Sequence, residues 1–406
     1  MTASSTPPLP APAQSALPPL APDLTWTDIA GARAGVVSAG MYPRTRDDVV
    51  VLVAPGTAAA ITTRSSAASA PCRWTRARVP GPCHAVVINA GNSNAATGPD
   101  GDAAVARTAE TAARLLGVAP DAILVCSTGV IGVPMPLDRL LPGVERAATS
   151  LDADGTRAAR AIMTTDLVPK QAAARAGGIS VAGFAKGSGM IHPNMGTMLA
   201  FVATDAQVHG PDLQALLSEI ADRTFNCVTV DGDTSTSDTL IVQATGHGPD
   251  ARPGTPGRAA LASALEAVCR ELARMIARDG EGAEHLLHVL VEGTESDAVA
   301  REAARAVCVS PLVKTAIYGR DPNWGRVVGA FGKAGVAGLD ALDLDFAGIP
   351  VLRAGRPLPF DEATASAALD APEVTIHARL PGPGLGEAWG CDLTPGYVSI
   401  NADYRS

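Results

Sequence analysis

The segment KGSGMIHPNMGTMLAFVATD, residues 186–205, points to both the fold and the chemistry of this chain. A glycine-rich stretch leads to Gly196-Thr197, and the apolar run 198–202 that follows predicts a buried strand. A threonine at the start of a buried strand is ordinarily only a β-former. The second interpretation is that the peptide bond before Thr197 is cleaved. The new amine, whose ordinary pKa is about 8, would then act as general base for the hydroxyl of the same threonine.

Strand-like and helix-like patterns alternate on both sides of this segment. Short β-branched runs that end at Pro or Gly predict buried strands, and helical spacing of apolar positions predicts helices. Strands are expected at 49–53, 85–88, 122–125, 179–185, 197–204, 227–231, 286–292, 373–380 and 397–401. Helices are expected at 102–116, 137–149, 212–225, 257–279 and 296–308. The sequence therefore predicts an α/β or α+β protein with helices layered on sheets, and the lack of a repeat period excludes a solenoid or propeller.

Composition excludes several classes of protein. The 406 residues are 47% apolar, which is enough for one large buried core or two of ordinary size. A net charge of −9 argues against a large nucleic-acid footprint, and no stretch approaches the roughly 18 apolar residues of a membrane helix. The seven cysteines are scattered without a CxxC pair, which favours reduced cytoplasmic thiols over disulfides or a zinc site.

The first 24 residues differ in character from the rest. Seven prolines fall between residues 7 and 22, and no charge appears before Asp23. Proline prevents both a helix and a sheet ladder, and a secretory signal would need a basic start and a continuous apolar core. We therefore expect a disordered tail over residues 1–24.

Metal and nucleotide sites find little support. His285 and His288 precede the apolar alternation 289–291 without the further His, Cys or carboxylate partners that metal sites usually have, so strand packing is the better interpretation. The glycine-rich stretches 186–189 and 329–333 lack the residue order of a phosphate-binding loop.

Other motifs suit a threonine nucleophile. STGVIG at 127–132 follows a predicted strand, where backbone N–H groups of a tight turn can form an oxyanion hole; the plain alternative is a strand-ending turn. Glu281 comes just after a predicted helix and is either a loop anchor or a group that binds an ammonium. Only four of the 32 basic residues are lysines, and Lys186 lies shortly before Thr197. A lysine kept where arginine is the default suggests a need for a compact, titratable ammonium.

Together these motifs resemble the ornithine acetyltransferase (glutamate N-acetyltransferase) family of arginine biosynthesis. The resemblance runs from about Ile29 to Ser406. It is carried, in order, by INAGNSNAATG (88–98), STGVIG (127–132), IMTTDLVPK (162–170), AKGSGMIHPNMGTML (185–199), FNCVTVDGDTSTSDT (225–239), RDGEGA (278–283), YGRDPNWGR (318–326) and INADYRS (400–406). Each motif alone is weak, but the ordered series is highly specific.

The resemblance implies a fold and a reaction. The fold would be α/β (α+β layered), with helices packed on mixed sheets as in DmpA and the ornithine acetyltransferases, and with a smaller C-terminal subdomain. Self-cleavage between Gly196 and Thr197 would give an α chain, residues 25–196 after the tail, and a β chain, residues 197–406, assembled as an α2β2 heterotetramer. Thr197 would accept acetyl from N2-acetylornithine and pass it to glutamate. No metal or redox cofactor is needed for such a transfer.

The resemblance also implies the roles of single residues. Thr128 and Gly129 match the oxyanion stabilisers of the family. Positions that bind substrate are matched by Thr164 or its neighbour Thr165, Lys186, Thr197, Glu281, Asn401 and Ser406. The C-terminal end is therefore expected to be ordered at the site, although polar chain ends often fray.

Several alternatives stay open at this point. Water instead of glutamate could resolve the acyl-enzyme, which would make the protein an amidase or aminopeptidase. The family usually has Ala where this chain has Gly196, and Asn where it has Ser237, which leaves room for a paralogue acting on another acylated amino acid. An uncleaved, inactive amino-acid-binding homologue is a third alternative. Whether acetyl-CoA is also a donor is left open as well.

Overall fold

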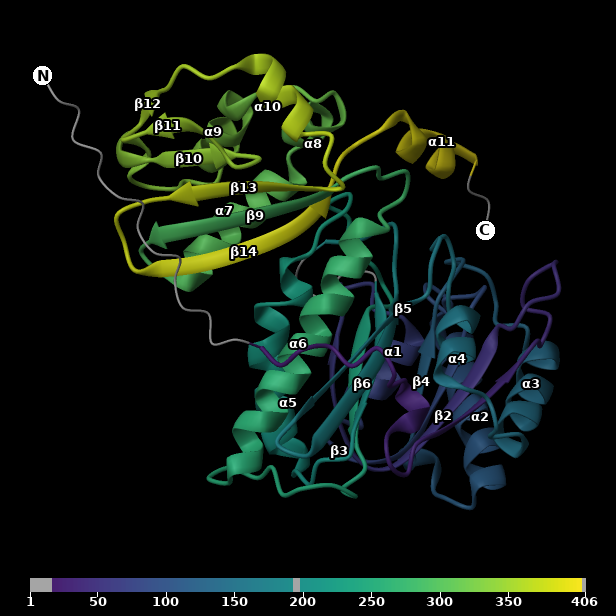
Figure 1. Ribbon diagram of the computed structural model, residues 1–406. Coiled ribbons are helices and arrows are strands. Elements are labelled where there is room, and N and C mark those ends of the chain that lie inside the picture. The colour runs from purple at the N-terminus through teal and green to yellow at the C-terminus, as the bar shows by residue number, and fades with distance from the viewer. Residues whose placement is uncertain (1–16, 193–197, 404–406) are drawn as a thin grey trace, which may run out of the picture.

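The computed structural model describes residues 17–192 and 198–403, which build two sheets with helices packed on them (Figure 1). The larger sheet contains, in spatial order, β4 (Ile123–Ser127), β3 (Gly81–Asn89), β2 (Val49–Thr62), β8 (Thr239–Ala244), β7 (Leu199–Thr204), β6 (Ile179–Lys186) and β5 (Lys170–Ala176), with β1 (Arg33–Val37) beside β2. The pairs β3–β4 and β7–β8 are parallel, and the other pairs are antiparallel. The sheet is therefore mixed, as predicted.

Both faces of the larger sheet are buried, which explains why its strands read as continuous apolar runs. On β2, Val50 and Leu52 belong to a core that also contains Phe184 of β6 and Phe201 of β7. The opposite face of β2 packs under α1 (Ala70–Arg76), α2 (Gly98–Leu116) and α3 (Leu137–Thr149), whereas α5 (Gly210–Asp222) and α6 (Pro256–Arg278) cover the half of the sheet with β5–β8. Figure 1 shows α5 and α6 at one end of this sheet and α2 and α3 at the other, and α4 (Gly155–Ala161) belongs to the core that contains Val50 and Leu52.

The second sheet forms a smaller C-terminal subdomain, as the resemblance implies. Its spatial order is β12 (Arg356–Pro357), β11 (Ile349–Arg353), β10 (Asp343–Phe346), β13 (Glu373–Arg379), β9 (Leu286–Thr294) and β14 (Gly384–Cys391). Its helices are α7 (Asp297–Val309), α8 (Pro311–Tyr318), α9 (Trp324–Lys333) and α10 (Glu362–Ala368). The last helix, α11 (Pro395–Asp403), stands apart from both helix layers in Figure 1.

Two predicted strands are wrong. Residue 227 is the last residue of a short 3-10 helix (Phe225–Cys227). Beyond it, the N–H of Thr229 bonds to Trp389 O and the N–H of Val230 to Ile191 O. The pairing with Trp389 is an isolated bridge and the bond to Ile191 is single, so no ladder forms. Residues 397–401 lie in α11, because Pro395 opens a helix and the Thr394 hydroxyl accepts a hydrogen bond from the N–H of Gly396.

The structure describes only the last part of the predicted tail over residues 1–24. Residues 1–16 lie outside the described part of the chain. From Leu17 the chain is described, and the N–H of Ala21 donates to the carbonyl of Ala173 on β5. Leu24 is already part of the core. Residues 20–24 are therefore part of the fold, in spite of Pro22.

The scattered cysteines and the histidine pair have packing roles. All seven cysteines are buried free thiols. His288 stacks on Trp389 and its Nε2 lies 2.9 Å from a carboxylate oxygen of Glu387, while His285 is buried with Nδ1 2.8 Å from Ala371 O. Within the described residues, no helix is long and apolar enough to cross a membrane.

Candidate functional site

A pocket of about 230 Å³ opens at one end of the larger sheet. Because β3 and β4 are parallel, their carboxyl ends meet there, and Lys186 at the end of β6 pairs with Leu199 at the start of β7. The pocket is lined by Ser93, Thr128, Gly129, Val130, Ile131, Thr164, Thr165, Lys186, Gly189, Met190, Ser235, Thr236, Ser237, Glu281 and Asn401. Segments that are far apart in the sequence thus converge on one cavity.

The structure brings the described site candidates together. Thr128, Gly129, Thr164, Thr165, Lys186, Glu281 and Asn401 all line this one pocket. Gly196, Thr197 and Ser406 lie outside the described residues. We call Thr128, Gly129 and Lys186 the strand-end side of the pocket, and Thr164, Glu281 and Asn401 the loop side.

The Thr128-Gly129 turn is held by its backbone. The N–H of Thr128 donates to Asn89 O over 3.0 Å, so this amide is occupied, contrary to the expectation that several N–H groups of the turn are free. The N–H of Gly129 has no acceptor among the residues that the structure describes. Gly129 has φ +128°, and an added Cβ would lie 2.4 Å from the carbonyl carbon of Gly91. Only glycine fits this turn.

Lys186 places a cation beside that turn. Its side chain is buried, and Nζ donates to the Thr128 hydroxyl oxygen over 3.3 Å. Since an ammonium can only donate, the Thr128 oxygen accepts, and the hydroxyl proton stays available for another acceptor. Burial lowers the pKa of Lys186 below its ordinary value, and the charge of Asp166 opposes that shift.

The loop side carries a carboxylate held by an amide. The Asn401 side-chain nitrogen donates to Glu281 Oε2 over 2.8 Å, so this contact places α11 at the pocket. Glu281 also donates its backbone N–H to Ser188 O. A Cβ on Gly189 would lie 2.3 Å from the Glu281 carboxyl group, so this glycine leaves the space that the carboxylate occupies.

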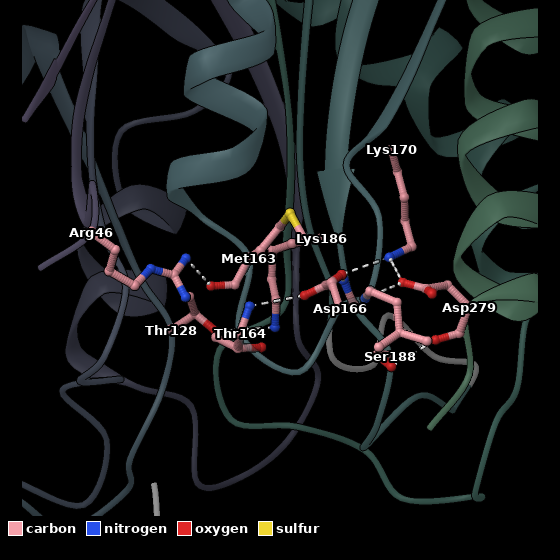
Figure 2. A network of polar contacts seen from close by, with 11 residues as sticks. Arg46, Thr128, Met163, Thr164, Asp166, Lys170, Lys186, Ser188 and Asp279 are labelled. Atoms are coloured by element: carbon pink, nitrogen blue, oxygen red, sulfur yellow. Dashed lines mark hydrogen bonds and ion pairs between the residues drawn. The ribbon is translucent and has the colours of Figure 1, made fainter. Parts of the chain in front are cut away.

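A buried charge network behind the pocket was not predicted (Figure 2). Lys170 Nζ lies 2.6 Å from Asp166 Oδ1 and 2.5 Å from Asp279 Oδ2. Burial alone would raise the pKa of Asp166, but the charges of Lys186 and Lys170 and the hydrogen bond from Gly187 outweigh it and hold the pKa at about 2. The scarcity of lysine was the signal that could have found this network, because Lys170 and Lys186 are two of only four lysines.

Four hydroxyl side chains that line the pocket were not predicted from the sequence. Ser93, Ser235, Thr236 and Ser237 line it without having been assigned a role. The Ser93 hydroxyl donates to Val130 O, and the Thr236 and Ser237 hydroxyls lie 3.2 Å apart. Their motifs, INAGNSN and DTSTSDT, mark the family but do not say which side chains face a ligand.

The pocket suits a small zwitterion that carries an acyl group. A buried ammonium and a carboxylate stand on different walls, as recognition of an amino acid requires. The Thr128 hydroxyl and the Gly129 N–H can together donate to an oxygen that gains negative charge. The arrangement can therefore bind an acylated amino acid and polarise its carbonyl.

Comparison with known proteins gives one consistent result. The sequence model of the ArgJ family matches residues 33–406. The arginine biosynthesis bifunctional protein ArgJ of Thermosynechococcus vestitus is 46% identical over 93% of this chain and 96% of its own length, and that of Symbiobacterium thermophilum is 48% identical over 92% and 98%. A crystal structure of the Bacillus halodurans protein of the same name shares 46% identity with a TM-score of 0.50, covering 51% of this chain and 100% of the solved chain.

Proposed function

Because this chain belongs to the ArgJ family, as its motifs predict, we propose that it moves an acetyl group from N2-acetylornithine to glutamate in arginine biosynthesis. The products would be ornithine and N-acetylglutamate. The observation that carries this proposal is the convergence of Thr128, Gly129, Lys186, Glu281 and Asn401 on one pocket. Donor and acceptor are both amino acids, so one pocket can serve each in turn.

The nucleophile in this proposal is Thr197, set free by cleavage after Gly196. Coverage by the relatives supports the cleavage: the proteins from Thermosynechococcus and Symbiobacterium align with more than nine-tenths of this chain, whereas the whole solved Bacillus chain aligns with 51% of it. Cleavage before residue 197 would divide the chain almost in half. No Ser-His-Asp triad is evident in the sequence. The free α-amine of Thr197, next to its hydroxyl, would instead act as the general base.

The transfer proceeds in two balanced steps. The Thr197 hydroxyl oxygen attacks the acetyl carbon, and the hydroxyl proton passes through the α-amine to the nitrogen of the breaking amide bond. Ornithine leaves, and the acetyl group remains on Thr197 as an ester. The developing oxyanion accepts hydrogen bonds from the Thr128 hydroxyl and the Gly129 N–H. Glutamate then attacks the ester through its amine, and the threonine hydroxyl is restored. Neither step consumes a metal ion or redox cofactor.

Substrate binding follows from the charges of the pocket. Lys186 would bind a carboxylate of either amino acid, and Glu281, steadied by Asn401, would bind an ammonium. Thr164, with Thr165 beside it, and Ser406 at the C-terminal end complete the proposed binding set. The relatives are named bifunctional, which agrees with acetyl-CoA as a second acetyl donor for glutamate.

Assembly and location belong to the same proposal. The two chains are proposed to stay together as α2β2, since β6 of the first half and β7 of the second half are hydrogen-bonded neighbours in one sheet. A cytoplasmic location agrees with seven buried free thiols in a chain of this size.

An assay with purified protein tests the function. Deacetylation of N2-acetylornithine is followed with and without glutamate, and the products are separated. We expect N-acetylglutamate to form in step with ornithine, with ping-pong kinetics. Free acetate formed at the same rate whether or not glutamate is present would instead identify a hydrolase, and no turnover would identify an amino-acid-binding homologue.

A further inference from the structure

The buried network of Figure 2 links the two sides of the pocket, and it has a composition that stability alone does not explain. Lys170 and Asp166 are fully buried as side chains, and Asp279 is 5% exposed. Replacing a buried ion pair with well-packed apolar residues is often neutral or stabilising, because desolvation cancels much of the attraction. We call Lys170 with its two carboxylates, Asp166 and Asp279, the clasp.

Asp166, one carboxylate of the clasp, holds the backbone at the pocket residue Thr164 and next to the pocket residue Lys186. Asp166 accepts the backbone N–H of Thr164 over 2.9 Å and that of Gly187, the neighbour of Lys186, over 2.7 Å. Arg46 supports the same loop, since its guanidinium donates to the carbonyl of Met163 over 2.8 Å. Asp166 therefore fixes the backbone positions from which Thr164 and Lys186 extend.

Asp279, the other carboxylate of the clasp, is connected to Glu281. Asp279 accepts the N–H of Leu167 at its carboxylate over 3.1 Å and the Ser188 hydroxyl at its carbonyl over 2.6 Å. Ser188 in turn accepts the N–H of Glu281 at its own carbonyl over 2.9 Å. Asp279 is only two residues from Glu281, so any movement of Asp279 carries Glu281 with it.

The proposed cleavage would place the two carboxylates of the clasp on different chains. Lys170, Asp166 and Lys186 precede residue 197, whereas Asp279 and Glu281 follow it. After cleavage no peptide bond fixes the separation of Lys186 and Glu281, and contacts between the two chains must do so. The Lys170–Asp279 ion pair is such a contact, located directly behind the pocket.

We propose that Lys170 is a positioning residue that sets the distance between the carboxylate-binding Lys186 and the ammonium-binding Glu281 by joining Asp166 of one chain to Asp279 of the other. This inference rests on the proposed function of the pocket. Lys170 does not line the pocket, and it acts through the two carboxylates. Its loss weakens the binding of both amino-acid substrates rather than the chemical step.

Three variants of the full-length protein separate positioning from charge balance. Lys170→Met leaves two buried carboxylates without their shared cation and can fail to fold. Lys170→Met/Asp279→Asn removes one charge of each sign, so the net charge of the clasp stays at −1 as in the wild type. The Asn side chain can still accept from Leu167. Arg270→Met is the matched control: it removes an ion pair with Glu387, at a position on α6 that does not line the pocket.

Steady-state kinetics of acetyl transfer then give the test. We expect the double variant to be cleaved and folded, with KM for glutamate and N2-acetylornithine raised about tenfold and kcat changed much less, since a small misplacement of a binding group costs this much or more. Arg270→Met should keep both KM values. Wild-type KM values in the double variant would overturn the role of Lys170, and so would a fall in kcat alone. An inactive wild type would instead contradict the proposed function.

Discussion

The two sides of the pocket differ in how firmly the fold holds them. On the strand-end side, Thr128 and Lys186 are 6% and 4% exposed and follow directly from β4 and β6. On the loop side, Glu281 is half-buried and Asn401 is exposed on α11. Groups that stabilise a transition state must have their geometry fixed before the reaction. The difference suggests that Thr128 and Gly129 on the strand-end side serve chemistry, whereas the loop side serves recognition.

Gly129→Ala is expected to have the largest effect, and it tests whether the strand-end side serves the chemical step. The added Cβ would meet the backbone of Gly91 at 2.4 Å, so the turn must move and take the Gly129 N–H with it. We expect kcat to fall by about 10²–10³, the usual cost of losing one oxyanion donor, with a smaller effect on KM. Steady-state kinetics of cleaved protein provide the measurement.

Gly132→Ala is the matched control for that variant. Gly132 lies in the same turn with φ +80°, and its added Cβ meets nothing within 4 Å. It should cost about 1 kcal/mol of stability from backbone strain and leave kcat near the wild-type value. Equal losses of kcat in the two variants would show that strain of the turn, rather than the Gly129 N–H, limits activity.

Acidification should loosen the clasp that joins the two sides. Asp166 has a pKa of about 2, against an ordinary 3.8, so its charge stabilises the fold above pH 3.8 and that contribution disappears as the pH falls towards 2. The loss is about 2 kcal/mol. Thermal unfolding of the wild type and of Asp166→Asn across this window checks it. The variant should be less stable at neutral pH and lose less on acidification; equal losses would contradict the assigned charge.

On the loop side, Glu281→Gln should act on binding. Glutamine keeps the shape of the side chain but removes the charge, so an ammonium loses a charged hydrogen-bond partner worth about 1.5 kcal/mol or more. We expect KM for both substrates to rise about tenfold while kcat changes little. A fall in kcat at unchanged KM would place Glu281 in the chemical step and end the distinction between the two sides.

The smallest effect is expected from Gly189→Ala. The new Cβ would lie 2.3 Å from the Glu281 carboxyl group, which is the movable end of a side chain and can shift aside. A rise of about threefold in KM is expected, smaller than for Glu281→Gln because the charge remains. Gly332→Ala on α9, where the Cβ meets nothing within 4 Å, should leave KM unchanged.

Local patterns predicted the larger helices and several core strands, but they missed β5, β8 and β14. The helix predicted at 137–149 is α3, with the same ends, because its amphipathic spacing is strong and its packing agrees. The alternation at 397–401 failed because Pro395 and Thr394, rather than the apolar residues, decide how that segment starts. Residues 227–231 failed because the segment starts in a 3-10 helix and forms only an isolated bridge and single bonds, which no local pattern shows.

The pocket was predictable only in part. Family motifs pointed to Thr128, Lys186, Glu281 and Asn401, which do meet. The role of Lys170 could not be read from its surroundings in the sequence, because Asp279 lies 109 positions away and only the folded chain places it 2.5 Å from the ammonium. Likewise, the occupied N–H of Thr128 depends on Asn89 of the neighbouring strand.

The central claim is that Thr197 becomes a free terminus and carries the acyl group, and intact-mass measurement tests it most directly. Purified protein is incubated with N2-acetylornithine in the absence of glutamate, beside Thr197→Ala as control. We expect two fragments, residues 1–196 and 197–406, with one acetyl group on the second, and a single uncleaved chain in the variant. A full-length chain that transfers acetyl at the full rate without ever carrying it would contradict the account.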